Sequence, residues 1–514
     1  MSTGAGGVVA AGHPISAAAG AQVLREGGNA VDAAIGAMLV SFASEALLTG
    51  LGAGGYMLVV APGREPVLLD FFVEAPGRGA DPAARSELLP ISVSFGDALQ
   101  VFHIGPASVG AYGTPAGVCQ ASERFGSVPL SELVRPAVRL AREGVELIPQ
   151  QAYVMEILGD IVTSTPECAA LFAPEGRLVR AGEVIYQPEL GDALERLGYD
   201  GAAPFYSGDI AGAIVDWVGS RGGMLTAEDL SGYGVVNREP IRARYRGRDV
   251  LMNPPPSAGG ILIARALGLL DNGDGDGTPS TDQLVAVMER TQNERTPDFL
   301  EGLDDPGFVE RFLRGEVKAA PPGGSGVDKA SGPLGSTTHI AVMDAEGWAC
   351  SVTCSNGSCS GVVVPGTGMH LNNMMGEQDL NPLGFHRHPA GRRMPSMMAP
   401  TAVLRDGHPE LVLGSAGSNR IRSAILQTIL RVVDDGLEAG DAVQAPRVHF
   451  EDGVVYVEPG IETEALERSG RTIARFRERN LFFGGVQAAE RDLEGEFWGG
   501  GDPRRGGAAV LVAR

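Results

Sequence analysis

The junction between a flexible segment and a β-hairpin constrains this chain more than any other stretch of it. Residues 318–336 read KAAPPGGSGVDKASGPLGS, which is the composition of a flexible linker. The segment ends abruptly at Thr337, and residues 338–343 are typical of a strand. A linker usually marks a domain boundary. Here the apolar run IAVM (340–343) predicts a strand buried between two layers, which complicates that interpretation.

The hairpin is expected from two short strands and the turn that joins them. Residues 338–343 and 348–353 form the strands, and DAEG (344–347) between them has turn chemistry. We place the centre of the turn between Ala345 and Glu346 and pair the strands symmetrically about that point.

This pairing brings a second hydroxyl close to Thr337. Thr337 is expected to lie opposite Thr353 or Cys354, and Ser355 lies on the same face a little further along the strand. Directly opposed side chains are roughly 5 Å apart at Cβ. A polar partner for Thr337 is therefore predicted from the turn alone.

A threonine at the start of such a strand has a chemical use if the bond before it is cut. Cleavage between Ser336 and Thr337 would leave Thr337 with a free α-amine, whose unperturbed pKa is about 7.7–8.0. That amine could act as general base for the Thr337 hydroxyl, as in N-terminal threonine nucleophiles. The same hydroxyl could make the cut by an N-to-O acyl shift. The ordinary alternative is that Thr337 and Thr338 are β-formers that start a strand after a linker.

Composition and charge narrow the class of protein. The chain has 514 residues, of which 44% are hydrophobic and 20% charged, so a large core is available. The length predicts two to four domains or one long α/β unit. The formal net charge of −22 argues against nucleic acid or an anionic membrane as a partner, because both need basic patches. No apolar stretch is long enough to predict a membrane span.

The cysteines favour a reducing compartment and no metal. Their odd number, with no evident secretory leader, favours free thiols and a cytoplasmic location. The last three are spaced C-x3-C-x4-C, which matches no common zinc pattern, so we expect small apolar packing and no metal or organic cofactor. The five are Cys119, Cys168, Cys350, Cys354 and Cys359.

Several helices and one strand are predicted from periodicity and caps. Apolar residues recur at helical spacing over 14–43, with Gly27-Gly28 as a break between two helices. Residues 131–143 and 261–270 are also expected to be helical, and an apolar strand should follow the glycine run at 50–55. Thr226 to Asp229 has the spacing of a helix N-cap.

The stretch STTHIAVMDAEGWACSVT resembles the maturation site of the γ-glutamyltransferase family, whose members are N-terminal nucleophile hydrolases. The resemblance extends over most of the chain, because further motifs follow in the order and spacing of that family. These are GGNAVDAAIGAML, GLGAGGYMLV, GGMLTAEDLSGY, NPPPSAGG, GTGMHLNNMM, RRMPSMMAPT and GSAGSNRI.

The resemblance implies an α+β fold and a proenzyme that cuts itself before Thr337. A large subunit (residues 1–336) and a small subunit (residues 337–514) would stay together as one domain, a four-layer αββα sandwich. The linker at 318–336 would then not be a domain boundary. A homo-oligomer is left open.

The resemblance also implies the catalytic residues. Thr337 matches the nucleophile, Thr353 the threonine that assists it, and Ser355 another usual hydroxyl. Gly417 and Ser418 match the loop whose backbone amides hold the oxyanion, where the family pattern is Gly-Gly. A helix is expected to start just after this loop, and its free N–H groups suit developing negative charge. The alternative for the loop is a plain N-cap.

Substrate-binding positions of the family fall on residues that are largely apolar here. The arginine that binds the glutamyl α-carboxylate is replaced by Phe72, and its paired serines become Ser396 and Met397. Arg78 is misplaced by several residues. Phe cannot replace the bidentate contact of an arginine with a carboxylate.

At the positions that bind the glutamyl amine in the family, this chain has Met374 in place of the amide and Glu377 at the position of the carboxylate. Asn356 corresponds to an asparagine near the second strand. The basic cluster HRHPAGRR (386–393) could supply a carboxylate anchor of different geometry or be a solvated loop. A structural role is expected for His339.

Three functions follow from this comparison of residues. The first is γ-glutamyl transfer to an amino acid, or hydrolysis of a γ-glutamyl amide such as glutathione. The second is an acylase for another small amide, resembling the cephalosporin-acylase or oxamate-amidase relatives, and the apolar replacements favour it. The third is a non-catalytic binding protein of the same fold. Retention of Thr337 and Thr353 argues against the third.

Overall fold

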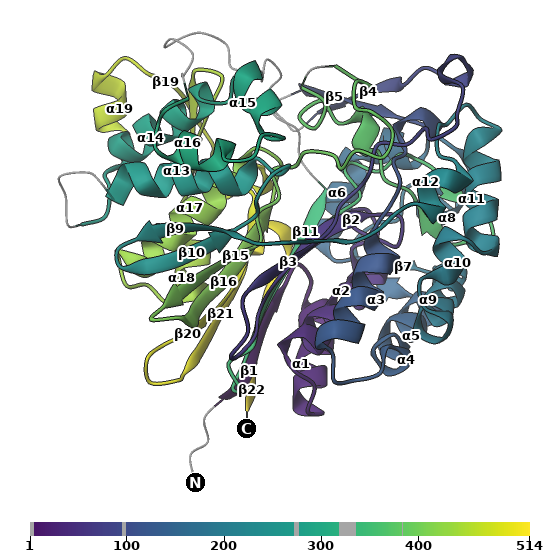
Figure 1. The fold of residues 1–514 in the computed structure, drawn as a ribbon, viewed down its shortest axis with the longest axis horizontal. Coiled ribbons are helices and arrows are strands. Elements are labelled where there is room, and N and C mark those ends of the chain that lie inside the picture. Colours follow the sequence, from purple (N-terminus) through teal and green to yellow (C-terminus); the bar gives the residue numbers. More distant parts are fainter. Residues whose placement is uncertain (1–4, 95–98, 272–276, 318–335, 383, 514) are drawn as a thin grey trace.

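Two β-sheets stacked face to face form the centre of the molecule (Figure 1). The computed structural model describes residues 5–94, 99–271, 277–317, 336–382 and 384–513. Within these residues, the first sheet has the order β22 (Ala508–Ala513), β1 (Ala5–Ala11), β11 (Thr337–Asp344), β12 (Ala349–Ser355), β2 (Gly54–Val60), β3 (Val67–Phe71) and β8 (Val236–Arg238). The second has the order β21 (Phe497–Gly501), β20 (Gly485–Arg491), β16 (His408–Ala416), β15 (Thr401–Arg405), β10 (Arg248–Met252) and β9 (Ile241–Tyr245).

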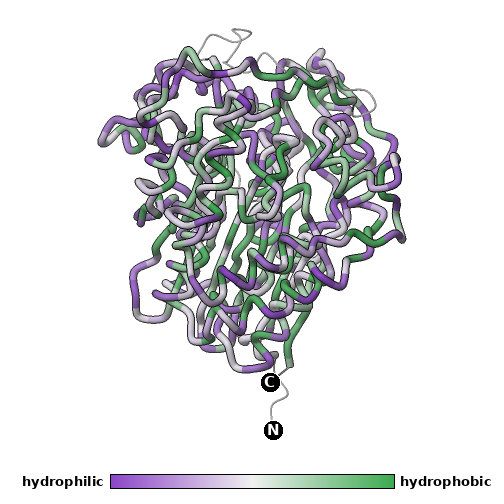
Figure 2. Tube along the Cα trace, turned by 90° about the vertical axis from the view of Figure 1, so that its right-hand side faces the viewer, coloured by the Kyte–Doolittle hydropathy of each residue, from purple (hydrophilic) through white to green (hydrophobic). Residues whose placement is uncertain are grey.

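Helices cover the outer face of each sheet, which gives four layers in the order α, β, β, α (Figure 1). The first sheet is covered by α1 (Pro14–Arg25) and α2 (Ala30–Ser44). The second is covered by α13 (Gly259–Asp271), α17 (Arg420–Val433) and α18 (Ala439–Gln444). Hydrophobic segments run through the middle of the molecule and hydrophilic ones gather at its periphery (Figure 2).

Further helices surround this sandwich, and short strands pair outside it. The helices are α3 (Thr114–Phe125), α4 (Leu130–Leu133), α5 (Arg135–Glu143), α6 (Pro149–Ile157), α7 (Gly159–Val162), α8 (Pro166–Phe172), α9 (Pro188–Asp200), α10 (Ala203–Tyr206), α11 (Asp209–Gly219), α12 (Ala227–Ser231), α14 (Thr281–Asn293), α15 (Pro297–Gly302), α16 (Phe308–Leu313) and α19 (Glu464–Arg468). The strands are β4 (Leu89–Ser94) with β5 (Leu99–Ile104), β6 (Val145–Glu146) with β7 (Val184–Ile185), β13 (Val363–Val364) with β14 (Met369–His370), and β17 (Val448–Glu451) with β18 (Val454–Val457) and β19 (Thr472–Arg475).

Strand β11 lies in the interior of the first sheet and is buried on both faces, as predicted from IAVM. Ala341 and Met343 pack between the sheets, whereas Ile340 and Val342 pack against α1 and α2. Because side chains alternate along a strand, Thr337 faces the space between the sheets and Thr338 faces the helices.

Segments on both sides of Thr337 contribute strands to both sheets. In the first sheet, β11 pairs with β1 on one side and with β12 on the other. In the second, β10 from the earlier segment pairs with β15 from the later one. The two parts of the sequence are therefore interleaved rather than stacked as separate bodies. The predicted linker lies outside the described residues, except for Ser336.

The predicted helices and cap are confirmed. Helices α1 and α2 are separated at Gly27-Gly28, and α4 and α5 cover residues 130–143 with a break at Val134, just before Pro136. Thr226 and Asp229 form a reciprocal capping box at the start of α12. In the described part of the chain, no helix is both long and apolar enough to cross a membrane.

The predicted register of the hairpin is wrong by one residue. The loop contains three residues, 345–347, and the N–H of Asp344 donates to the carbonyl of Trp348 at 3.0 Å. Gly347 has φ +90°, a left-handed conformation that suits the last position of a three-residue hairpin loop. Thr337 therefore pairs with Ser355, and Thr353 pairs with His339.

Close packing between α1 and α2 can be tested with glycine substitutions. A Cβ on Gly20 would lie 2.8 Å from the carbonyl oxygen of Ala33, whereas a Cβ on Gly212 in α11 would meet open space. We expect Gly20→Ala to lower the apparent melting temperature, because overpacking costs about 1–3 kcal/mol and exceeds the gain of about 1 kcal/mol in helix propensity. Gly212→Ala is the matched control and should keep or raise it. Equal melting temperatures for the two variants would contradict this packing.

Candidate active site

Ser355 forms the hub of a short chain of hydroxyl groups at the start of β11. The Thr337 hydroxyl donates to Ser355 Oγ at 3.0 Å, and Ser355 Oγ donates to the carbonyl oxygen of Ser336 at 2.8 Å. The N–H of Gly357 also donates to Ser355 Oγ, at 3.1 Å. A serine hydroxyl has one donor and two acceptor positions, so all of them are used. The side chains of Thr337 and Ser355 are buried.

This arrangement links a nucleophile to the bond that precedes it. Ser355 Oγ can take the proton of the Thr337 hydroxyl while it passes its own proton to the Ser336 carbonyl oxygen. Proton transfer of this kind is general acid–base catalysis by a positioned side chain. Because Thr337 Oγ1 and the Ser336 carbonyl carbon belong to neighbouring residues, their attack would close a five-membered ring.

Thr353, the expected assistant, contacts a different residue. Its hydroxyl lies 2.8 Å from Nδ1 of His339, and Ser351 Oγ lies 3.4 Å from Nε2 of the same ring. Burial lowers the pKa of His339 to about 3, so the imidazole is neutral. A Cβ on Gly414 would collide with this ring, so the backbone of β16 packs directly against it. The structural role expected for His339 fits these contacts.

The loop before α17 presents free backbone N–H groups near Thr337. Gly417 and Ser418 both have positive φ, +121° and +50°. In the described part of the chain, neither of their N–H groups donates a hydrogen bond. Ser418 lines the same pocket as Thr337, and α17 begins at Arg420. Free N–H groups at a helix start stabilise negative charge.

Contacts on both sides hold this loop in place. Ser418 Oγ donates to Oδ2 of Asp379 at 2.5 Å. Asn419 donates to Oε1 of Glu451 at 2.8 Å, and Arg420 lies 3.8 Å from Oε2 of the same carboxylate. The left-handed conformation of Ser418 is unusual for a residue other than glycine and is held by these contacts.

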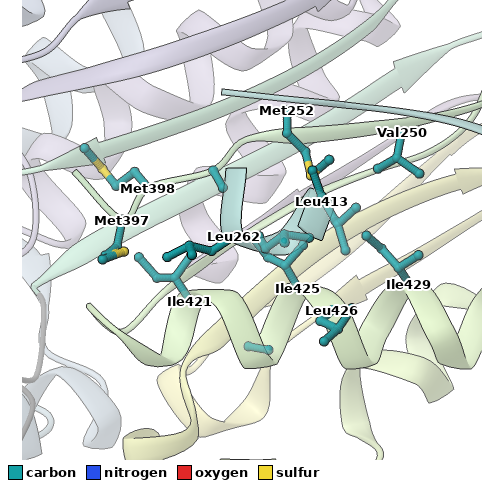
Figure 3. Close-up of a cluster of buried hydrophobic side chains, with 14 of the residues drawn as sticks. Val250, Met252, Leu262, Met397, Met398, Leu413, Ile421, Ile425, Leu426 and Ile429 are labelled. Atoms are coloured by element: carbon teal, nitrogen blue, oxygen red, sulfur yellow. The ribbon is translucent and has the colours of Figure 1, made fainter. Parts of the chain in front are cut away.

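A pocket opens beside Thr337 and contains most of the predicted substrate-binding residues. Of the residues named from the sequence, those that line it are Phe72, Thr337, Ser355, Met374, Glu377, Ser396, Met397 and Ser418. Figure 3 shows Met397 and Met398 alongside Ile421, at the edge of the core between α17 and the second sheet. The wall of the pocket is thus continuous with the hydrophobic core.

Asn356 does not line this pocket. Its side-chain amide donates to the carbonyl oxygen of His370 at 3.1 Å, and Gly357 occupies the lining instead. Asn356 is thus not among the predicted residues that the structure brings together at this pocket.

Other lining residues were not predicted. They are Gly357, Asp379, Leu380, Met398 and Ile421. Met398 lies in the motif RRMPSMMAPT and directly follows the predicted Met397, and Asp379 lies two residues after the predicted Glu377. Ile421 could have been found from the expected helix start, because the first turn of that helix must face the same space as Ser418.

Comparison with known proteins finds similarity over nearly the whole chain. The family described as gamma-glutamyltranspeptidase matches residues 16–512. The chain belongs to the gamma-glutamyltranspeptidase family. Acylase ACY 1 proenzyme of Pseudomonas sp. (strain SE83) is 31% identical over 99% of this chain and 94% of its own. Glutathione hydrolase proenzyme of Escherichia coli (strain K12) is 31% identical over 97% of this chain and 90% of its own.

A solved structure extends the likeness to the fold. The crystal structure of cephalosporin acylase from Bacillus halodurans matches with a TM-score of 0.82 and 26% sequence identity, over 99% of this chain and 96% of that one. The chain is thus an enzyme of the gamma-glutamyltranspeptidase family with a mixed α and β fold. The names of its relatives are divided between acylase and glutathione hydrolase.

In this member of the gamma-glutamyltranspeptidase family, the arginines considered as carboxylate anchors form hydrogen bonds and ion pairs with other residues of the chain. Arg393 donates to the carbonyl oxygens of Phe72 and Gly234 and to the Tyr233 hydroxyl. It also lies 3.5 Å from Asp70 and from Glu74.

The two other arginines considered from the sequence are also paired. Arg78 binds Glu74 at 3.1 Å, and Arg392 binds Asp304 at 2.6 Å. None of the three arginines lines the pocket. The basic cluster at 386–393 therefore supplies no pocket-lining carboxylate anchor among the described residues.

Glu377 is a buried acid at the pocket. Its Oε1 accepts hydrogen bonds from the N–H and the hydroxyl of Ser358, at 2.7 and 2.8 Å. Burial, followed by the nearby charge of Asp379, raises the pKa of Glu377 to about 7. The folded protein therefore favours a protonated Glu377 more than the unfolded chain does.

This shift predicts a pH-dependent stability. Between the unfolded pKa of about 4.3 and the folded value, the folded chain binds a proton that the unfolded chain has released, so stability falls as the pH rises through this window. Glu377→Gln should reduce the fall in melting temperature between pH 5 and pH 7.5. Part of the fall in melting temperature should remain in this variant, because burial also raises the pKa values of Glu45 and Glu490 to about 7.

The matched control for this prediction is Glu65→Gln. Glu65 is exposed, and its substitution should keep the wild-type dependence on pH. A Glu377→Gln variant with the full wild-type fall would show that Glu377 is ionised in the folded protein throughout this range.

Proposed function

We propose that this protein cuts itself between Ser336 and Thr337 and then works as an amidohydrolase with Thr337 as N-terminal nucleophile. The observation that carries the proposal is the hydroxyl chain from Thr337 through Ser355 to the Ser336 carbonyl. The segments 1–336 and 337–514 would stay together, because their strands share both sheets.

The cut proceeds in two steps. Thr337 Oγ1 attacks the Ser336 carbonyl carbon, its proton goes to Ser355 Oγ, and Ser355 passes a proton to the carbonyl oxygen. The C–N bond then breaks, the proton on the former carbonyl oxygen is transferred to the nitrogen, and Ser336 is left as an ester on Thr337 Oγ1. Water hydrolyses this ester, which releases the carboxyl end of Ser336 and the free amine of Thr337.

Turnover uses the same hydroxyl. The Thr337 amine accepts the hydroxyl proton while Oγ1 attacks the amide carbonyl of the substrate. In this proposal the N–H groups of Gly417 and Ser418, which donate no hydrogen bond among the described residues, stabilise the oxyanion. Expulsion of the protonated leaving amine gives an acyl-threonine, and water or an amino acid then accepts the acyl group.

For the substrate, the pocket supports an acylase that acts on an amide other than γ-glutamyl. Among the described residues, its lining contains no arginine, lysine or histidine, and Phe72 stands where the resemblance expects an arginine. A carboxylate moved against this apolar wall would lose its hydration with no compensating bond. The acylase and cephalosporin acylase relatives are consistent with this choice.

γ-Glutamyl transfer or glutathione hydrolysis is the second candidate. Glu377, at the position where the resemblance places the carboxylate that binds the glutamyl amine, does line the pocket. The relative named glutathione hydrolase supports it at the same level of identity as the acylase. Rates on a γ-glutamyl amide and on amides that lack the carboxylate separate the two.

Self-cleavage is tested by intact mass spectrometry. Purified protein should separate under denaturing conditions into two fragments, the smaller of which begins with Thr337. Thr337→Ala should remain one chain, because it lacks the attacking hydroxyl. A single uncut mass for the wild type after long incubation near neutral pH would contradict the proposal and favour a binding protein of the same fold.

Ser355 and Thr353 should differ in their effect on this cut. Ser355→Ala removes the group that contacts both Thr337 and the Ser336 carbonyl, so the rate of cleavage should fall on the order of 10²-fold. Thr353→Ala removes a partner of His339 instead and is the matched control, with a smaller effect. Fragment formation over time, followed by mass spectrometry, gives both rates. A larger effect for Thr353→Ala would return the assisting role to that residue.

A further inference from the structure

The first three residues of β11 have a paired strand on one side only. β1 pairs with residues 340–344 of β11, and among the described residues it pairs with none of residues 337–339. β12 pairs with all three. The start of β11 therefore lacks one of the two neighbours that hold the rest of the strand. The end of a chain segment is poorly ordered unless another contact ties it down.

The proposed cut removes a second restraint on Thr337. Before the cut, the peptide bond to Ser336 holds Thr337, and Ser336 is itself buried with its carbonyl oxygen bound to Ser355. After the cut, Thr337 is held by its bond to Thr338 and by its pairing with β12. A shift of a catalytic group by about 1 Å can lower a rate on the order of 10²-fold. The contacts of Thr338 thus affect how well the nucleophile is placed.

A buried acid binds the side chain of Thr338 on the helix side of the first sheet. The Thr338 hydroxyl donates to Oε2 of Glu45 at 2.8 Å, and the two residues are 2% and 1% exposed. Glu45 directly follows α2 as its C-cap. Its backbone N–H donates to the carbonyl oxygen of Ser41 at 2.7 Å, so the acid is fixed to the end of that helix.

Gly12, which directly follows β1, leaves room for this contact. A Cβ on Gly12 would lie 2.4 Å from Oε2 of Glu45 and 2.6 Å from Oγ1 of Thr338. Any other residue at this position would displace one of the two partners. The pairing of β1 with β11 ends at Ile340, and the contact between Glu45 and Thr338 lies just beyond that point.

Stability alone does not account for an acid at this place. Glu45 Oε1 is buried and has no hydrogen-bond partner among the described residues. An unsatisfied polar atom in the interior costs about 1–3 kcal/mol. Burial raises the pKa of Glu45 to about 7, although the Thr338 hydrogen bond and the charge of Arg505 act to lower it. Acids with such raised pKa values are concentrated at functional sites.

We propose that Glu45 is a positioning residue for the nucleophile, because it fixes the free end of β11 after the cut through the Thr338 hydroxyl. The inference rests on the proposed function, since this free end exists only if the bond between Ser336 and Thr337 is cut. Glu45 is not part of the described pocket lining. Its effect should therefore be on the placement of Thr337 and not on the binding of substrate.

Periodate oxidation measures the order of the free end without a substrate. Periodate cleaves the amino alcohol of an N-terminal threonine to a glyoxylyl group, with release of acetaldehyde and ammonia and reduction of periodate to iodate. An aminooxy probe captures the new aldehyde, and mass spectrometry of the fragment 337–514 gives the rate. We expect Thr338→Val, which keeps the side-chain shape but removes the donor, to react about 10-fold faster than the wild type. Thr338→Ser restores the donor and should react at nearly the wild-type rate.

Steady-state kinetics separate placement from binding. The probes are γ-glutamyl p-nitroanilide and butyryl p-nitroanilide, one for each candidate substrate class. Thr338→Val should lower kcat about 10-fold and keep KM within about twofold, because a displaced nucleophile slows the reaction without changing the pocket. Glu45→Gln, which keeps an acceptor oxygen but loses the charge, should lower kcat by a smaller factor.

The matched control is Ser44→Ala. Ser44 precedes Glu45 in the chain and is also buried, but its hydroxyl contacts Ser16 Oγ at 3.0 Å and the carbonyl oxygen of Val40 at 3.3 Å. This variant should keep the wild-type kcat and the wild-type rate of oxidation. Self-cleavage reports on the folding of every variant, and in Thr338→Val it should slow less than kcat does, because Ser336 still holds Thr337 before the cut.

The outcomes distinguish this inference from the proposed function. Cut variants of Thr338 and Glu45 with wild-type oxidation rates and kcat, or a raised KM at unchanged kcat, overturn the inference and leave the amidohydrolase in place. An uncut wild type contradicts the proposed function and, with it, the free end of β11. If the cut enzyme turns over neither anilide, the oxidation rates decide the inference alone. If Thr338→Val is not cut, the comparison of Glu45→Gln with Ser44→Ala decides it.

Discussion

The pairing of β11 with β12, in the register that sets Thr337 against Ser355, is the constraint on which the site depends. Asp344 fixes the other end of this pairing, since its side chain accepts from the N–H of Trp348 across the loop and from the N–H of Ala30 at the start of α2. A slip by one residue would turn every side chain of β11 to the opposite face. Thr337 would then face the helices, and the hydroxyl chain to Ser336 would be lost.

Polar groups in this site are arranged so that each has a defined task. The three hydrogen-bonding positions of Ser355 Oγ are used by the Thr337 hydroxyl, the carbonyl oxygen of Ser336 and the N–H of Gly357. His339 is held neutral beside Thr353, so its imidazole adds no charge next to that hydroxyl. The acids of the pocket lining are Glu377 and Asp379.

Features that depend on neighbouring residues could be predicted from the sequence, whereas contacts between distant segments could not. The apolar run at 340–343 predicted a strand buried on both faces, because adjacent apolar residues place apolar side chains on both of its sides. The register depended on whether the turn has two or three residues, and the left-handed Gly347 selects three. The engagement of Arg393 could not be predicted, because its partners Asp70 and Glu74 lie far away in sequence.

Interleaving of the two segments changes what stability means for this molecule after a cut. Before the cut, unfolding and refolding involve one chain and are independent of concentration. After it, β11 begins a separate chain that is held between strands of its own segment and of the other. Unfolding would release two chains, neither of which contains all the strands of either sheet, and recovery would become a slow bimolecular encounter. The lifetime of the cut form is then set by its unfolding barrier and not by an equilibrium.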